Sequence, residues 1–359
     1  MDSRALVAFG LIWGLLTIYA LLAALDFGAG FYRWLAYRRG RDEAHTIADD
    51  FLTPVWEVVN VFLVLLVVGT IGFFPLSAAI FGTSLLLPFS LAVIVLTVRG
   101  VAIGFSHLGK HPSRPYETAI GIGGLLAPAL LVSFVAASES GAITFDAGVV
   151  HVSQGLLWFS PLYLALALLA VVTTTHLSAL LLYRRALLRS AAKAAAFYRR
   201  AALHSGLVSG ALAMVLLLAL RWVAPDHLSA LIGLWPLLLA VALGWALDLW
   251  MLTHRNGARR GPLALFAGLS AWGLAIVLFG LTRLPWLLYG QVRLDEALTP
   301  PAMFTALIVT VAIGMLVLVP SLVLLYMVLL RPAEPTSAGT SAASERQRTR
   351  DRTAVTAGS

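Results

Sequence analysis

The sequence predicts an all-α membrane protein with about nine transmembrane helices, on the basis of its composition, its apolar runs and its arginine distribution. Of the 359 residues, 60% are hydrophobic and only 12% are charged, and the mean hydropathy is +0.90. A soluble domain is closer to half apolar and a quarter charged. We therefore expect the chain to bury most of its apolar surface in lipid.

A helix that crosses the apolar core of a bilayer needs roughly 20 apolar residues. Nine stretches qualify, at 5–25, 55–72, 75–98, 117–138, 157–183, 201–222, 227–251, 262–283 and 302–330. Two four-helix bundles plus one peripheral helix would be compatible with this count, although no sequence repeat demonstrates it. We interpret residues 1–331 as the transmembrane domain and residues 332–359, rich in Ser, Thr, Ala and Gly, as a disordered cytoplasmic tail.

The basic residues predict the orientation in the membrane. All but four of the 25 Lys and Arg residues fall in alternate connections and in the tail, the exceptions being Arg4, Arg221, Arg283 and Arg293. Basic loops favour the cytoplasmic side. Nine helices then place the N-terminus outside and the tail inside. The net charge of +8 has the same explanation, so it does not indicate nucleic-acid binding.

Several kinds of chemistry are excluded by composition and motifs. The chain has no cysteine, which rules out disulfides, iron–sulfur clusters and thiolate zinc sites. No phosphate-binding glycine loop and no His-Glu-x-x-His motif is present. The histidines form no evident pair at matching depth in facing helices. We therefore predict that this chain ligates no metal.

Three ionisable residues mark the ends of the first three predicted helices. Asp26 ends the first, Glu57 begins the second and Arg99 ends the third. Because these helices alternate in direction, we expect the three side chains at one depth, near the cytoplasmic boundary. Ionisable groups in a membrane are costly and often functional. The two interpretations are a structural ion pair and a path for protons or cations.

Two more ionisable residues are secondary candidates. Asp248 lies near the inner end of the seventh predicted helix, either as an intramembrane site or as an interfacial acid beside aromatic anchors. His176 follows Thr173-Thr174-Thr175 in the fifth helix. It could ligate haem iron or form a hydrogen bond to a neighbouring helix.

Four motifs occur in a fixed order between residues 15 and 105: Asp26-Phe27-Gly28-Ala29-Gly30, Pro54-Val55-Trp56-Glu57, Phe74-Pro75 and Val98-Arg99-Gly100-Val101-Ala102. Their order and spacing resemble subunit II of the cytochrome bd quinol oxidases. That family has Asp-Leu-Gly-x-Gly at the end of its first helix and Pro-Val-Trp-Asp-Gly-Asn-Glu at the start of its second. The helix count and the basic loop after the fifth helix are also similar.

The resemblance implies a membrane complex of prokaryotic cells that oxidises quinol and reduces dioxygen to water. Haems b and d would belong to the partner, subunit I, and this chain would ligate none of them. Subunit II would support assembly and conduct protons from the cytoplasm, through Asp26, Glu57 and Arg99. The resemblance also allows for a structural quinone or lipid and for small single-helix subunits.

The chain departs from the family pattern beside the key acids. Glu57 replaces the usual Asp, and Val58-Val59-Asn60 replaces Gly-Asn-Glu, so one acid is missing. The acid and the basic residue after the arginine motif are Gly104 and Ser106, which leaves Ser106, His107 or Lys110 for any route there. Two other hypotheses are a small-molecule transporter, which would have helices interrupted near the midplane, and a purely structural subunit.

Overall fold

The structure, a computed structural model, describes residues 2–106, 113–146, 148–254 and 257–329. The predicted tail, 332–359, and the candidates His107 and Lys110 lie outside this part of the chain. The chain divides into two units, Met1–Leu307 and Ile308–Ser359. The first unit is described below, and helix α14 (Pro301–Leu329) continues from it into the second.

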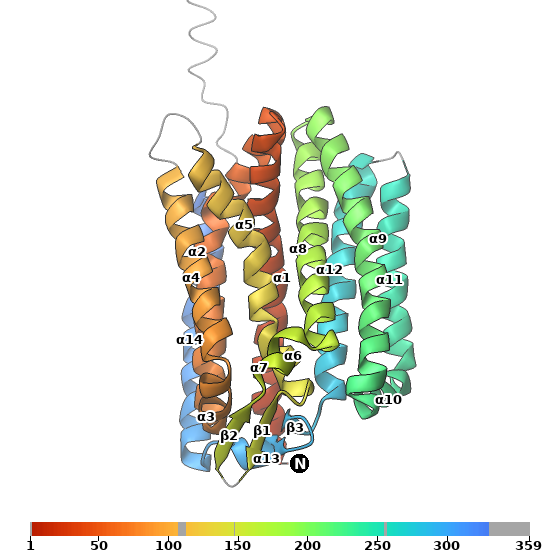
Figure 1. The fold of residues 1–359 in the computed structure, drawn as a ribbon. Helices are drawn as coiled ribbons and strands as arrows, with labels where there is room; N and C mark the ends of the chain where they lie inside the picture. The colour runs from red at the N-terminus through yellow and green to blue at the C-terminus, as the bar shows by residue number, and fades with distance from the viewer. Residues whose placement is uncertain (1, 107–112, 147, 255–256, 330–359) are drawn as a thin grey trace, which may run out of the picture. The chain divides into compact units, whose positions relative to one another are not determined.

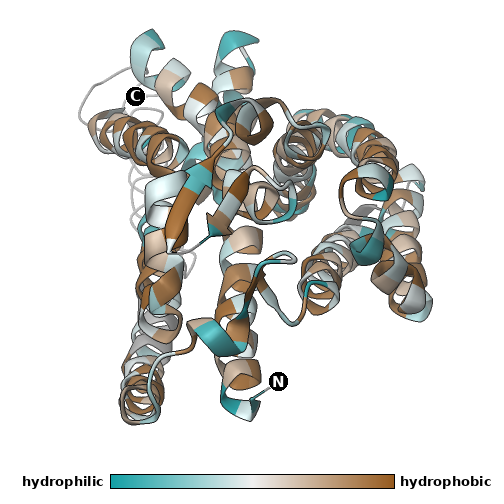
Figure 2. Ribbon diagram, turned by 60° about the horizontal axis from the view of Figure 1, so that its bottom comes forward, coloured by the Kyte–Doolittle hydropathy of each residue, from teal (hydrophilic) through white to brown (hydrophobic). Residues whose placement is uncertain are grey.

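Long helices make up most of the first unit: α1 (Ser3–Arg38), α2 (Asp42–Phe73), α4 (Leu86–Ser106), α5 (Arg114–Leu131), α8 (Pro161–Leu188), α9 (Ala192–Val223), α11 (Trp235–Thr253) and α12 (Gly257–Thr282). Shorter helices connect them: α3 (Pro75–Ser84), α6 (Ser133–Glu139), α7 (Gln154–Phe159), α10 (Pro225–Gly233) and α13 (Leu294–Ala297). Eight helical stretches in the described ranges are long and apolar enough to cross a membrane. Figure 2 shows apolar residues along these helices and the most hydrophilic residues at their ends and connections.

The fold is therefore all-α and polytopic, as predicted, while a ninth crossing by α14 remains a prediction. Figure 1 shows α1 and α8 side by side, with α2, α4 and α5 flanking α1 and with α9, α11 and α12 flanking α8. Both central helices end on the same side, which carries Arg38, Arg39 and Arg189. We call it the arginine-rich side.

The helices extend further than their apolar runs predict. Helix α1 has 36 residues, or about 54 Å at 1.5 Å per residue. Asp26 therefore lies inside the helix, roughly 18 Å before its end at Arg38, rather than at the end. Likewise, α2 begins at Asp42, well before Glu57, and α4 continues past Arg99 to Ser106. The helical segments extend because polar side chains such as Arg33 are buried among neighbouring helices.

The basic segment 183–200 is a helical hairpin. Helix α8 ends at Leu188, five residues beyond the predicted end of the fifth helix, and α9 begins at Ala192. Ser190 between them has a left-handed backbone, with φ of 56°. Gly40, in the turn between α1 and α2, has nearly the same φ of 59°. The two turns also close with equivalent hydrogen bonds, from Arg41 N to Ala36 O and from Ala191 N to Ala186 O, both 2.9 Å.

These turns belong to an internal repeat that the sequence did not reveal. Helices α2 and α9 end at Phe73 and Val223, and α3 and α10 begin at Pro75 and Pro225, so these positions differ by 150 residues in both cases. The same offset relates Asp26 to His176 and Gly28 to Ser178. Because α1 and α8 run in the same direction, this is a parallel repeat of the kind found in some transporters.

The third and seventh predicted helices are each broken within their first half. The first break is at Leu85, between α3 and α4, and the second is at Leu234, between α10 and α11. Pro88 and Pro236 follow closely. Proline has no N–H to bond the carbonyl four residues earlier, so each break lies where a helical hydrogen bond cannot form.

Two small antiparallel hairpins lie opposite the arginine-rich side, where only loops were expected. Strands β1 (Ile143–Asp146) and β2 (Val149–Val152) pair with Ile143 opposite Val152. Strands β3 (Trp286–Leu288) and β4 (Val292–Arg293) form the second hairpin. Gln291 joins the two hairpins, because its side-chain Nε2 donates to the Ile143 carbonyl oxygen at 3.0 Å.

Candidate functional site

Asp26 and Arg99 form a buried ion pair between α1 and α4. An Arg99 terminal nitrogen lies 2.8 Å from Asp26 Oδ2, and the other donates to the Asp26 carbonyl oxygen at 3.1 Å. The guanidinium also lies over the Phe27 ring, 5.1 Å from its centre. Asp26 is 1% exposed and Arg99 is 3% exposed. The sequence predicted that these two residues meet, and the structure brings them together.

Glu57 does not join this pair, although all three residues were expected in one cluster. Its side chain is exposed, and no ion pair of Glu57 occurs within the described ranges. It begins a row of exposed residues on one face of α2 that continues with Val61, Val64 and Val68. The alternation of helix direction predicted the depth of Glu57 but carried no information on the face of α2 that it occupies.

A second buried cluster, which was not predicted from the sequence, lies nearer the arginine-rich side. Arg33 on α1 is 2.8 Å from Glu117 on α5 and 3.0 Å from Asp49 on α2. His45 Nε2, also from α2, is 3.2 Å from the same Glu117 oxygen. The Asp49 side chain is 27% exposed and that of His45 is 14% exposed, whereas Arg33 and Glu117 are buried. The cluster therefore connects the interior with the surface.

The two clusters share one face of α1. Arg33 follows Asp26 by two helical turns, which places it on the same side of the helix and about 10 Å further along it. The sequence already indicates this shared face, because Arg33 follows Asp26 at helical spacing. It was overlooked because the helix was predicted to end before Arg33.

His176 and Asp248 meet in the second half of the repeat. His176 Nε2 lies 3.1 Å from Asp248 Oδ2, and Nδ1 lies 3.0 Å from the carbonyl oxygen of Ala202. Both side chains are fully buried. His176 thus has the hydrogen bond to a neighbouring helix that was one of its two expected roles. Asp248 is buried rather than exposed beside the aromatic residues of α11, because that helix turns it toward α8.

A third cluster lies opposite the arginine-rich side. Glu139 forms an ion pair with Arg283, whose Nε lies 3.4 Å from Glu139 Oε1. The other carboxylate oxygen, Oε2, lies 3.3 Å from His227 Nδ1. The other His227 nitrogen is 2.8 Å from the Thr282 hydroxyl oxygen. Burial lowers the pKa of the Arg283 guanidinium, and the Glu139 carboxylate opposes this shift. The cluster joins α6, α10 and the segment after α12.

The two fully buried histidines do not suit haem iron. A haem ligand needs a free ring nitrogen, and both nitrogens of His176 and His227 are already engaged. In the part of the chain that the structure describes, no three His, Cys, Asp or Glu side chains gather as a metal site. Neither His176 nor His227 therefore offers a free ring nitrogen to haem iron.

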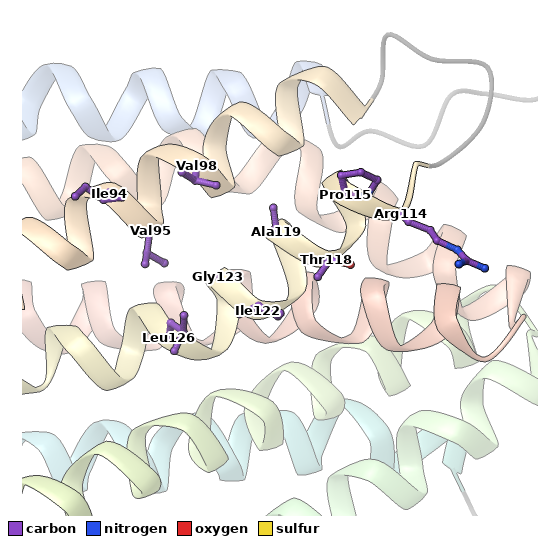
Figure 3. A pocket seen from close by; sticks show the side chains of 10 residues that line it. All are labelled: Ile94, Val95, Val98, Arg114, Pro115, Thr118, Ala119, Ile122, Gly123 and Leu126. Atoms are coloured by element: carbon purple, nitrogen blue, oxygen red, sulfur yellow. The ribbon is translucent and has the colours of Figure 1, made fainter.

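An apolar groove of about 610 Å³ lies between α4 and α5 (Figure 3). Ile94, Val95 and Val98 line it from α4, and Ile122 and Leu126 line it from α5. Arg114 is the charged residue of its lining. The groove offers no acid or base pair for catalysis, and its size and lining suit a hydrocarbon chain.

The fold and these clusters define a multi-pass membrane protein with several ion pairs in its interior. The chain matches the family model described as cytochrome bd terminal oxidase subunit II over residues 4–329. A putative cytochrome bd menaquinol oxidase subunit II of Bacillus subtilis (strain 168) is 31% identical over 325 residues, covering 89% of this chain and 94% of that protein.

The fold is similar to that of a solved chain from the bd oxidase of Geobacillus thermodenitrificans. The TM-score is 0.78 at 31% identity, covering 92% of this chain and 100% of that one. This chain therefore belongs to the cytochrome bd terminal oxidase subunit II family and is a component of an oxidoreductase complex. The family implies haems in the complex.

Proposed function

We propose that this chain pairs with a haem-bearing subunit I in the cell membrane of a prokaryote, in a complex that oxidises quinol and reduces dioxygen to water. Its own task is to conduct protons from the cytoplasm to that subunit. The observation that carries this proposal is the line of buried groups along α1. The Arg33–Glu117 cluster reaches solvent through His45 and Asp49, and the Asp26–Arg99 pair lies two turns deeper.

The groups in this line have complementary roles. His45 and Asp49 exchange protons with water at the surface, and Glu117 accepts them from His45. Arg33 and Arg99 balance the charge of the acids beside them when those acids are ionised. An ionised carboxylate is ready to accept the next proton. Water spans the distance of about 10 Å between the levels of Arg33 and Asp26.

Glu57 is the proposed site of transfer to the partner. A carboxylate that faced lipid inside the bilayer would cost a few kcal/mol. We therefore infer that subunit I covers the exposed face of α2 and takes the proton from Glu57. The groove between α4 and α5 is the proposed place for the isoprenoid chain of a structural quinone or for a lipid chain. Small single-helix subunits remain a further expectation of the resemblance.

The transporter hypothesis has less support. A transporter has broken helices near the midplane, at its substrate site. Here the breaks at Leu85 and Leu234 follow short helices at the side opposite the arginine-rich one. Arg99 and Asp248 lie several turns after these breaks. His227 lies before the second break, on α10, but it belongs to the cluster at the side opposite the arginine-rich one. Family membership also favours the oxidase.

Replacing Glu57 tests the proton role. Glu57→Gln keeps the shape of the side chain and removes its titrating proton. We expect oxygen consumption per mole of haem to fall at least tenfold, within the range for a positioned proton-transfer group. Assembly should persist, because a neutral amide costs less to bury than a carboxylate.

Glu57→Asp is the matched control, because it retains the carboxylic acid on a shorter side chain. Its turnover should stay within a few-fold of the parent protein. If Glu57→Gln assembled with unchanged turnover per haem, the proton role would be wrong. The purely structural role would then account for this subunit.

A further inference from the structure

The internal repeat places His176 and Asp248 where the first half has Asp26 and Arg99. In both halves the pair joins the central helix, α1 or α8, to the third long helix, α4 or α11. The acid and the basic residue change places between the halves. The central helix carries the acid in the first half and the basic residue in the second. A guanidinium does not lose its proton in proteins, whereas an imidazole can.

The hydrogen bonds of His176 determine how many protons the pair holds. Its Nδ1 lies 3.0 Å from the Ala202 carbonyl oxygen, which can only accept, so Nδ1 carries a hydrogen. Its Nε2 lies 3.1 Å from Asp248 Oδ2. That contact needs one more proton, which can reside on the imidazole or on the carboxyl group. In either case the pair is neutral overall.

Two observations place this proton on Asp248. Both side chains are fully buried, which disfavours separated charges. The 3.1 Å contact is longer than the roughly 2.7–2.9 Å of a charge-assisted bond, whereas the Asp26–Arg99 contact is 2.8 Å.

The neighbouring helices present no competing charge. From α9, the backbones of Ala202 and Gly206 lie against His176. From α12, Gly268 lies against the carboxyl group of Asp248. Across the described ranges, no ion pair involves either residue apart from the one that joins them.

Two further buried polar atoms indicate bound water beside the pair. Thr173 Oγ1 and Trp272 Nε1, like Asp248 Oδ1, have no partner in the part of the chain described. Thr173 lies one turn before His176 on α8, and Trp272 lies one turn after Gly268 on α12. Because these helices run in opposite directions, both residues lie on the side of the pair away from the arginine-rich end. Unpaired buried polar groups of this kind commonly bind water.

We propose that Asp248 is a carboxylic acid that donates to neutral His176 and exchanges its proton through water bound near Thr173 and Trp272. The second half of the repeat would then hold its acid beside an imidazole, which can lose its proton, where the first half holds its acid beside a guanidinium, which cannot. This site is separate from the proton route proposed for the first half. Its test does not depend on turnover.

Infrared spectroscopy of the protein purified in its native assembly tests the proposal. The difference between spectra in H₂O and D₂O isolates exchangeable carboxylic acids, because their C=O stretch moves to lower frequency in D₂O. We expect such a band from the parent protein and its loss in Asp248→Asn. Asp50→Asn is the matched control, since Asp50 is an exposed carboxylate paired with Arg189, and it should leave the band unchanged.

Two results would overturn the proposal: the absence of the band from the parent protein, or its persistence unchanged in Asp248→Asn. If Asp248→Asn does not assemble, Asp248→Glu decides the question. A displaced band in that variant would assign the band to this position, and an unmoved band would refute the assignment. His176→Gln provides a second readout, because weakening the hydrogen bond at Nε2 should shift the band without removing it.

Discussion

At the scale of single residues, Arg99 makes contacts beyond its ion pair with the Asp26 carboxylate. Its guanidinium reaches the carboxylate and the backbone carbonyl of Asp26 and also covers the Phe27 ring. Planar, bidentate contacts of this kind suit arginine and not lysine. Arg99 therefore orients α1 against α4 as well as balancing the charge of Asp26.

A double-mutant cycle should separate these contributions. Arg99→Leu leaves Asp26 buried without its cation, and we expect a loss of about 3–5 kcal/mol in stability and a lower yield of assembled protein. Adding Asp26→Leu removes the uncompensated charge and should recover most of the loss. Thermal unfolding of the purified assemblies measures the loss in Arg99→Leu and its recovery in the double variant. Additive effects of the two changes would contradict the coupling.

At the scale of helices, the contact between α1 and α8 joins the two halves of the repeat. Gly28 on α1 and Ser178 on α8 are equivalent positions that face each other. The Ser178 hydroxyl lies 2.8 Å and 2.7 Å from the carbonyl oxygens of Ala24 and Leu25. Small residues at such a crossing let two helices in a membrane approach closely.

Enlarging Gly28 should force these helices apart. A Cβ at this position would lie 2.6 Å from Ser178 Cβ, which no real contact tolerates. We expect Gly28→Ala to destabilise the protein by about 1–3 kcal/mol, seen as a lower melting temperature. Gly14→Ala in the same helix is the control, because a Cβ added at Gly14 would meet no atom of a neighbouring helix within 4 Å. Equal effects of the two substitutions would contradict this account of the crossing.

The sequence predicted the helices better than their ends or faces. Apolar runs are long enough to identify the helices, but a run stops at the first polar residue, while α1 continues through buried Arg33. Charge and depth predicted that Asp26 meets Arg99, yet the direction in which Glu57 points depends on the rotation of α2. The repeat stayed hidden because equivalent positions, such as Asp26 and His176, carry different chemistry.

At the scale of the whole chain, the distribution of basic residues predicts the orientation in the membrane. Within the first unit, the turns after α1 and α8 carry arginines, and the β1–β2 hairpin carries none. Arginine-rich connections stay in the cytoplasm. The hairpin and the N-terminus should therefore face outward, and the Arg33–Glu117 cluster should face the cytoplasmic supply of protons.

Labelling of single cysteines tests this orientation, because the native chain has none. Thr144 in the hairpin and Lys193 at the start of α9 are both exposed. In spheroplasts or protoplasts, whose cytoplasmic membrane is intact, a membrane-impermeant maleimide should modify Thr144→Cys without permeabilisation. It should modify Lys193→Cys only after the membrane is permeabilised, and this step also shows that the position is accessible. The reverse pattern would invert the topology and place the proposed proton uptake on the wrong side of the membrane.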